Sequence, residues 1–165
     1  MPDKVIFLDI DGVLNHADYG EDIYYDKFAG IEVPLDKDNL TQLESLLQQV
    51  PDAKIVWSTD WKDCQTDKWN NWTNPRIFLE SQPFIKERIL GRTSSKMSSE
   101  HFHDIQWWLK DHSDVKTYVI LEDSYFPNEW FGLEKHLVRV DPNKGLTKND
   151  VEQAVKTLNE GENNG

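Results

Sequence analysis

The sequence predicts an α/β fold of three layers, in which helices cover both faces of a mainly parallel central sheet. Four short, mostly apolar segments are typical of buried strands: residues 4–8, 53–57, 117–121 and 137–140. Segments with apolar residues at helical spacing alternate with these strands, and this alternation favours parallel pairing. Polar residues follow three of the four strands, at the edge of such a sheet where ligands bind.

The first half of the chain supplies two of the strands and one helix. Residues 4–8 (KVIFL) form a near-continuous apolar run, and residues 24–33 predict a short hairpin. A helix is expected over residues 36–50, because leucines recur there at helical spacing until a proline follows. Residues 53–57 (AKIVW) then predict the second strand.

The second half begins with the least regular part of the sequence. Residues 61–99 are polar and rich in tryptophan, with one strand or helix expected near 77–90. A helix is expected over residues 99–111, followed by the strands at 117–121 and 137–140. A Thr-Lys-Asn-Asp capping box opens the last helix, over residues 147–158.

Size and charge limit the classes of protein that the chain can belong to. We expect one domain over residues 1–158 and a disordered tail over 159–165. The net charge of −12 disfavours coating of a nucleic-acid duplex, although it allows contact with one end of a strand. A single cysteine, Cys64, permits no intrachain disulfide and is typical of a reducing compartment. We expect a cytoplasmic protein with no membrane partner, because no signal-peptide pattern or membrane-spanning segment is recognisable.

Two aspartates, Asp9 and Asp11, follow the first strand. Residues two apart point to the same side of a strand, so both carboxylates are expected in the crevice at its end. A shared Mg²⁺ ion, which prefers oxygen ligands, would relieve their repulsion. Asp9 could then attack phosphorus, and Asp11 could act as acid and base. The alternatives are that the two acids cap a loop or form a metal site without catalysis. An EF-hand is excluded, because an EF-hand loop has glycine at its sixth position, whereas Gly12 is the fourth residue counted from Asp9.

Polar residues after two other strands can complete such a site. Ser58 or Thr59 could hold a phosphoryl oxygen, with Ser58 favoured because it comes first, or the pair could cap a helix. Glu122 and Asp123 end the third strand, where one of them could complete the metal shell or cap a helix.

A transferred phosphoryl group also needs a positive side chain nearby. The candidates stand before or within the first turn of the helix that begins near residue 99. They are Lys96, His101 and His103, and the sequence does not choose among them.

Three stretches resemble motifs of haloacid dehalogenase (HAD) superfamily phosphatases. Phe7-Leu-Asp-Ile-Asp-Gly-Val-Leu-Asn15 resembles the first motif, Ile55-Val-Trp-Ser58 the second and Val119-Ile-Leu-Glu-Asp123 the fourth. The likeness spans nearly the whole chain. It is greatest to a branch associated with RNA-repair proteins, which resembles the phosphatase half of polynucleotide kinase-phosphatases.

The resemblance implies a Rossmann-like fold and Mg²⁺-dependent phosphatase chemistry. It implies that Asp9 is the nucleophile and a metal ligand. Asp11 would be the acid and base and would lend its backbone carbonyl to the metal, and Ser58 would bind the phosphoryl group. Glu122 and Asp123 would hold Mg²⁺, although the family usually has aspartate at both positions.

Two further features depart from the family pattern. The third motif normally supplies lysine or arginine, whereas His101 occupies that place here and Lys96 stands five residues earlier. The segments after the first and second motifs are too short for a full cap domain, so the resemblance implies an open site that suits a large substrate.

Two main hypotheses follow. The first is a phosphomonoesterase that forms an aspartyl-phosphate and acts on a polynucleotide end or on a nucleotide. The alternative is a catalytically weak or inactive binding module that keeps the fold. Phosphotransfer to an acceptor other than water is a further variant of the first hypothesis.

Overall fold

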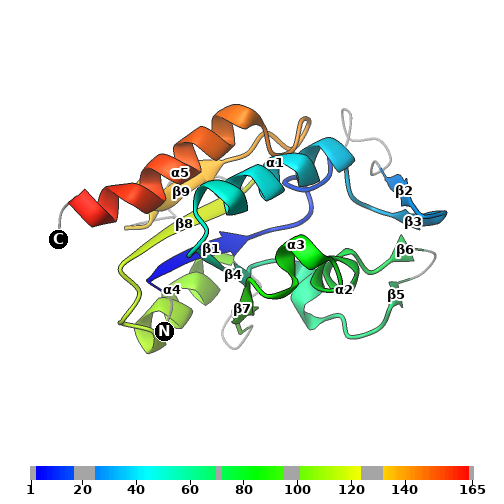
Figure 1. Ribbon diagram of the computed structural model, residues 1–165. Coiled ribbons are helices and arrows are strands. Elements are labelled where there is room, and N and C mark those ends of the chain that lie inside the picture. Colours follow the sequence, from blue (N-terminus) through cyan, green and yellow to red (C-terminus); the bar gives the residue numbers. More distant parts are fainter. Residues whose placement is uncertain (1–2, 17–24, 70–71, 95–100, 124–131, 164–165) are drawn as a thin grey trace.

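The computed structural model describes residues 3–16, 25–69, 72–94, 101–123 and 132–163. A five-stranded sheet with the order β7-β4-β1-β8-β9 forms the centre, and every neighbouring pair is parallel (Figure 1). Its strands are β1 (Lys4–Leu8), β4 (Lys54–Trp57), β7 (Ile89–Arg92), β8 (Thr117–Glu122) and β9 (Leu137–Arg139). The predicted α/β fold is therefore confirmed.

The central position of β1 explains its continuous apolar sequence. It pairs with β4 on one side and β8 on the other, so every residue of the strand is buried. Alternate residues contribute to separate cores. Ile6 and Leu8 belong to one apolar cluster, whereas Val5 and Phe7 belong to the other.

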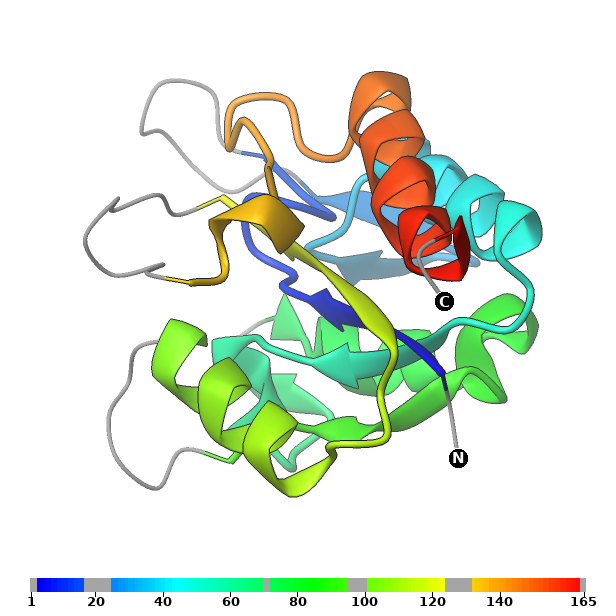
Figure 2. The ribbon, with the colours of Figure 1, turned by 90° about the vertical axis from the view of Figure 1, so that its left-hand side faces the viewer.

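These two clusters lie on opposite faces of the sheet, which gives the three layers (Figure 2). Helices α1 (Lys37–Gln49) and α5 (Lys148–Asn163) pack together on one face. Helix α4 (His101–Asp111) covers the other face, where Trp108 meets Phe7 edge to face with ring centroids 5.3 Å apart.

Polar side chains fix the starts of two helices. Asp36 accepts a hydrogen bond from the backbone N–H of Asn39 at 2.9 Å and so caps α1. Thr147 and Asp150 bond reciprocally, with Asp150 Oδ2 accepting from Thr147 N at 2.9 Å, so the predicted capping box is confirmed.

The end of α5 differs from the prediction. The sequence predicts that the helix ends at residue 158, whereas α5 continues to Asn163. No proline interrupts this segment, and Asn159 Oδ1 accepts a hydrogen bond from Lys4 Nζ at 3.2 Å, which ties the added turn to β1.

Short elements fill the connections after β1 and β4. The predicted hairpin after β1 is present as β2 (Asp26–Phe28) and β3 (Ile31–Val33). Ala29 and Gly30 both have positive φ at its turn. The connection between β4 and β7 contains helices and strands of at most six residues: η2 (Asp60–Asp63), β5 (Lys68–Trp69), β6 (Trp72–Thr73), α2 (Pro75–Glu80) and α3 (Pro83–Lys86).

A further short helix, η3 (Glu134–His136), precedes β9. Within the described ranges, the connections that follow β1 and β4 contain no elements of the size of a cap domain. No helix in these ranges is both long enough and apolar enough to cross a membrane.

Candidate active site

Three neighbouring strands bring polar residues to one edge of the sheet. Asp9 follows β1, Ser58 follows β4, and Glu122 is the last residue of β8. The backbone continues the parallel pairing at this point: Ser58 N donates to Leu8 O at 2.9 Å, and Asp9 N donates to Leu121 O at 3.2 Å. The carboxyl ends of the strands therefore place these three residues side by side, as the sequence predicts.

Asp9 and Glu122 form a pair of deeply buried acids. Asp9 is 4% exposed and Glu122 is 1% exposed. Burial raises the pKa of Asp9 well above its ordinary value, and the negative charge of Glu122 raises it further. Asp9 Oδ1 accepts one hydrogen bond, from Ile10 N at 2.8 Å. Two buried carboxylates so close together repel each other, and a cation bound between them would offset this repulsion.

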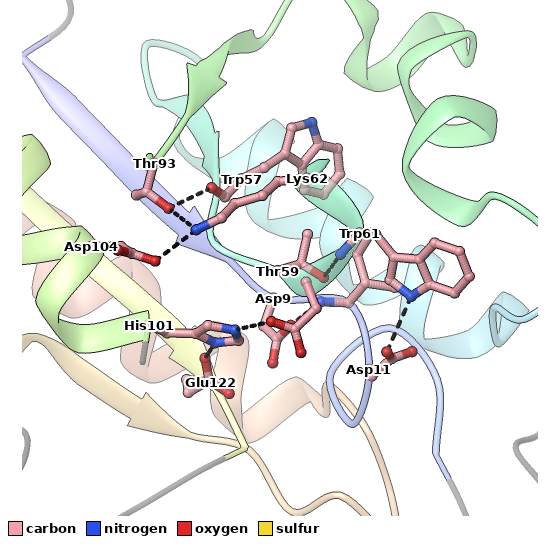
Figure 3. A network of polar contacts seen from close by, with 12 residues as sticks. Asp9, Asp11, Trp57, Thr59, Trp61, Lys62, Thr93, His101, Asp104 and Glu122 are labelled. Atoms are coloured by element: carbon pink, nitrogen blue, oxygen red, sulfur yellow. Dashed lines mark hydrogen bonds and ion pairs between the residues drawn. The ribbon is translucent and has the colours of Figure 1, made fainter. Parts of the chain in front are cut away.

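His101, the first residue of α4, lies against this acid pair (Figure 3). Its Nδ1 is 2.6 Å from Glu122 Oε2, and its Nε2 is 3.1 Å from Asp60 Oδ1. Ligand atoms of Asp9, His101 and Glu122 lie within 4.8 Å of one another. Among the residues that the structure describes, these three side chains are close enough together to bind one metal ion.

The Asp11 carboxylate points elsewhere, toward Trp61 (Figure 3). Its Oδ1 accepts from Asn15 Nδ2 at 3.0 Å, and its Oδ2 accepts from Trp61 Nε1 at 3.1 Å. The expectation that both carboxylates point the same way fails, because β1 ends at Leu8 and the two-residue alternation of a strand no longer applies. Burial raises the pKa of Asp11, while these two hydrogen bonds lower it in part.

A pocket of about 370 Å³ opens beside Asp11. Its lining residues are Asp11, Asp60, Trp61, Asp63 and Cys64. The pocket therefore has acidic side chains and an indole ring in its wall.

Asp123 follows the end of β8 and lies against the turn after β1. Its side chain lies so close to Gly12 that a Cβ at residue 12 would overlap the Asp123 carboxylate. Gly12 also has φ +81°, which glycine adopts without strain. The negative charge of Asp123 contributes to the raised pKa of both Asp9 and Asp11, so it lies within electrostatic range of both.

The structure separates the roles of Ser58 and Thr59. Thr59 caps η2, because its Oγ1 accepts from Trp61 N at 3.3 Å. Ser58 is 1% exposed, and its Oγ has no hydrogen-bond partner in the described part of the chain. A buried hydroxyl without a partner costs stability, so this atom indicates where a ligand oxygen would bind.

Of the three predicted cations, only His101 faces the acid pair in the described structure. His103 is exposed, and Lys96 lies outside the described residues.

The sequence analysis did not predict a second charged cluster nearby. Lys62, in η2, donates from Nζ to Asp104 Oδ2 and to Thr93 Oγ1, both at 2.8 Å. Lys62 is 2% exposed and Asp104 is 3% exposed. Asp104 stands next to Ile105 on the inward face of α4, so an acid at a core position of the helix was the available signal.

The comparisons with known proteins agree with this architecture. Residues 5–151 match the family described as the HAD domain in Swiss Army Knife RNA repair proteins. The match covers most of the chain and includes all three strand ends that form the site. No curated protein and no solved structure matches the chain.

A mainly parallel α/β sheet with acids at its carboxyl edge defines the class as a HAD-type fold. The chain belongs to the family of HAD domains found in Swiss Army Knife RNA repair proteins. This membership supports a phosphatase-type hydrolase function in general.

Proposed function

We propose that this protein is a Mg²⁺-dependent phosphomonoesterase in which Asp9 is phosphorylated during turnover. One observation carries the proposal: the buried Asp9, after the central strand, stands between Glu122 of β8 and Ser58 after β4, and the buried Ser58 hydroxyl has no hydrogen-bond partner among the described residues. A nucleophile, a metal-binding acid and a free donor are thus together at one sheet edge.

The acids fit a divalent cation. Asp9 and Glu122 are buried like charges, and their mutual repulsion is relieved when a cation lies between them. Asp9 and Glu122 would hold the ion through their carboxylates, with the Asp11 backbone carbonyl and Asp123 completing the set. When bound, the ion would offset the negative charge of the phosphoryl oxygens.

The chain's own residues then account for the reaction in two steps. In the first, a carboxylate oxygen of Asp9 attacks phosphorus, the bond to the leaving oxygen breaks, and Asp11 gives that oxygen a proton. In the second, Asp11 takes a proton from water, the water oxygen attacks phosphorus, and Asp9 is released with inorganic phosphate. The raised pKa of Asp11 suits a group that must carry a proton at the start of the cycle.

Ser58 and a positive side chain would hold the phosphoryl oxygens. The Ser58 hydroxyl donates to one of them, which satisfies its unused hydrogen-bonding capacity. His101 and Lys96 are the proposed cations, and Lys62 is less suited because Asp104 and Thr93 already occupy its ammonium group.

The substrate that we propose is a polynucleotide end or a nucleotide. Family membership favours a nucleic-acid end, and the absence of a cap-sized element in the described connections is consistent with a large substrate. The net charge of −12 and the acidic pocket beside Asp11 favour a substrate that presents few phosphates. Salt dependence separates the two, because contacts to several phosphates give a steep loss of affinity with salt and one monoester does not.

A catalytically weak binding module is the second candidate. It is favoured by His101, which stands where the family usually has lysine or arginine. Both ring nitrogens of His101 contact carboxylates, of Glu122 and Asp60, so neither points to open space where a phosphoryl oxygen could bind. The buried, unpartnered Ser58 hydroxyl is a cost that such a module would have no reason to keep.

Hydrolysis of an aryl phosphate tests the proposal. We expect turnover with Mg²⁺, and loss of at least about 10³-fold with chelator or with Asp9→Asn, because both remove an essential part of the reaction. Asp114→Asn is the matched control, since Asp114 is an exposed aspartate before β8. Equal rates in all preparations would contradict the proposal, and no turnover in any of them would favour the binding module.

A further inference from the structure

We propose that His101 is a direct ligand of the site's cation, and that the centre therefore selects a nitrogen-accepting transition metal such as Mn²⁺ over Mg²⁺. This inference rests on the proposed metal-dependent function, and within it assigns His101 to the metal ion rather than to the phosphoryl oxygens. Mg²⁺ would still bind through the carboxylates, but with no benefit from the imidazole.

The geometry of the three side chains is the first argument. One ligand atom each from Asp9, His101 and Glu122 lie within 4.8 Å of one another. Ligands on opposite sides of an ion are about 4.2 Å apart when each bond is about 2.1 Å long. Small side-chain movements would therefore bring all three atoms onto one ion.

The orientation of the imidazole is the second argument. Nδ1 faces Glu122 (Figure 3), and the other ring nitrogen, Nε2, lies 3.1 Å from Asp60 Oδ1. Metal-binding histidines commonly use their second nitrogen in this way, with a carboxylate that fixes the ring. Asp60 is exposed, whereas Glu122 is buried, so the ring joins an outer acid to the inner ion site.

A third observation points independently to a ligand at this place. Ser58 continues the pairing beside Asp9, and its buried Oγ has no hydrogen-bond partner in the described part of the chain. A water or phosphoryl oxygen bound to the ion could accept that hydrogen bond. The site therefore has a vacant donor next to the ligand group, which a self-contained polar network would not leave.

The donor set decides the class of metal. Mg²⁺ prefers oxygen ligands and loses its waters reluctantly. First-row transition ions accept imidazole nitrogen more readily than Mg²⁺ does, and their affinity for such a site rises from Mn²⁺, the weakest, toward the later ions. Two carboxylates with one imidazole thus favour Mn²⁺ or a later ion more than carboxylates alone would.

Metal binding to the whole chain, with Mn²⁺ and Mg²⁺ as the probes, tests the inference. Titration calorimetry should show that His101→Asn weakens Mn²⁺ binding about 10-fold or more while Mg²⁺ binding changes by less than about 3-fold. Pulsed electron paramagnetic resonance of bound Mn²⁺ should show coupling to a nitrogen nucleus in the wild type and lose it in the variant. His112→Gln, one residue beyond the opposite end of α4, is the control that should retain both properties.

His101→Lys separates this role from that of a cation for the phosphoryl group. A lysine supplies positive charge but no imidazole, so we expect Mg²⁺-supported hydrolysis to persist while the Mn²⁺ preference and the nitrogen coupling disappear. Nitrogen coupling without any phosphatase activity would leave the metal inference standing and overturn the proposed function. A wild-type Mn²⁺ signal without nitrogen coupling, or equal losses of both metals in His101→Asn, would overturn the inference.

Discussion

Two buried charged clusters share helix α4, and they differ in how their charges are balanced. Asp104 is paired with Lys62, and the ammonium group also donates to Thr93. One turn earlier in the same helix, His101 lies against the two acids Glu122 and Asp9. The first cluster has one positive and one negative charge, whereas the second has two acids and a histidine.

This difference separates a structural ion pair from the proposed functional site. A buried ion pair whose partners are both hydrogen-bonded needs nothing further and holds η2 against α4. The acid pair has a raised pKa at Asp9 and lies beside an unpartnered hydroxyl at Ser58. Both features are expected of a site that binds a cation and a phosphoryl group, which is the function proposed for it.

The largest expected effect on stability comes from breaking the balanced cluster. Lys62→Met leaves the Asp104 carboxylate buried without a counter-charge, and we expect the free energy of unfolding to fall by about 3 to 5 kcal/mol. Urea denaturation measures the loss. The double variant Lys62→Met/Asp104→Leu removes both charges and should recover much of it. No recovery in the double variant would show that the pair contributes something other than charge balance.

A smaller loss is expected at the edge of the unbalanced cluster. Gly12→Ala places a Cβ against Asp123 and forces alanine to φ +81°, which we expect to cost about 1 to 2 kcal/mol and to displace Asp123. Thermal unfolding and phosphatase rate measure the two effects. Gly91→Ala is the control, because a Cβ there would meet open space. Similar losses at both glycines would contradict this interpretation.

The same substitution should have opposite effects in the two clusters. The pKa of Asp9 is raised in the folded state, so its ionised form destabilises the fold above the ordinary carboxyl value of 3.8 and not below it. Asp9→Asn should therefore raise the Tm of the metal-free protein by a few degrees at neutral pH, and the gain should shrink as the pH falls toward 3.8.

Asp104→Asn should instead lower the Tm at neutral pH, because it leaves Lys62 buried without its counter-charge. Differential scanning calorimetry across a pH series compares the two variants. Loss of stability in both would show that Asp9 is already balanced in the metal-free protein.

The smallest effect is expected for a pair at the surface. Lys116 and Asp3 are 3.4 Å apart and largely exposed, so Lys116→Ala should change the free energy of unfolding by less than about 1 kcal/mol. Urea denaturation at low and high salt measures this change in the free energy of unfolding, with which the losses in the other variants can be compared. A larger effect would show that burial does not explain the difference between the clusters.

The sequence predicts the centre of the fold well, because central parallel strands are buried on both faces and read as continuous apolar runs. Residues 4–8 and 117–121 illustrate this, and both agree with β1 and β8 within one residue. The connection between β4 and β7 could not be predicted in the same way. Its helices and strands have two to six residues, too few for a periodic pattern to emerge.

The candidate site is predictable only in part. The positions of Asp9, Ser58 and Glu122 follow from where strands end, since parallel strands bring their carboxyl ends to one edge. The direction of Asp11 does not follow, because it depends on a turn rather than on strand geometry. The partner of Lys62 is not predictable either, because it stands 42 residues later and meets Lys62 only through the packing of α4.

Trapping of the phosphorylated enzyme is the most direct test of the central claim. Protein with Asp11→Asn, which should slow hydrolysis of the intermediate, is mixed with an aryl phosphate and Mg²⁺, quenched in acid and reduced with borohydride. Peptide mass spectrometry should then find homoserine in place of aspartate at position 9 and at no other acid. Turnover of the substrate by the wild type without modification of Asp9, or with modification at a different residue, would contradict the account.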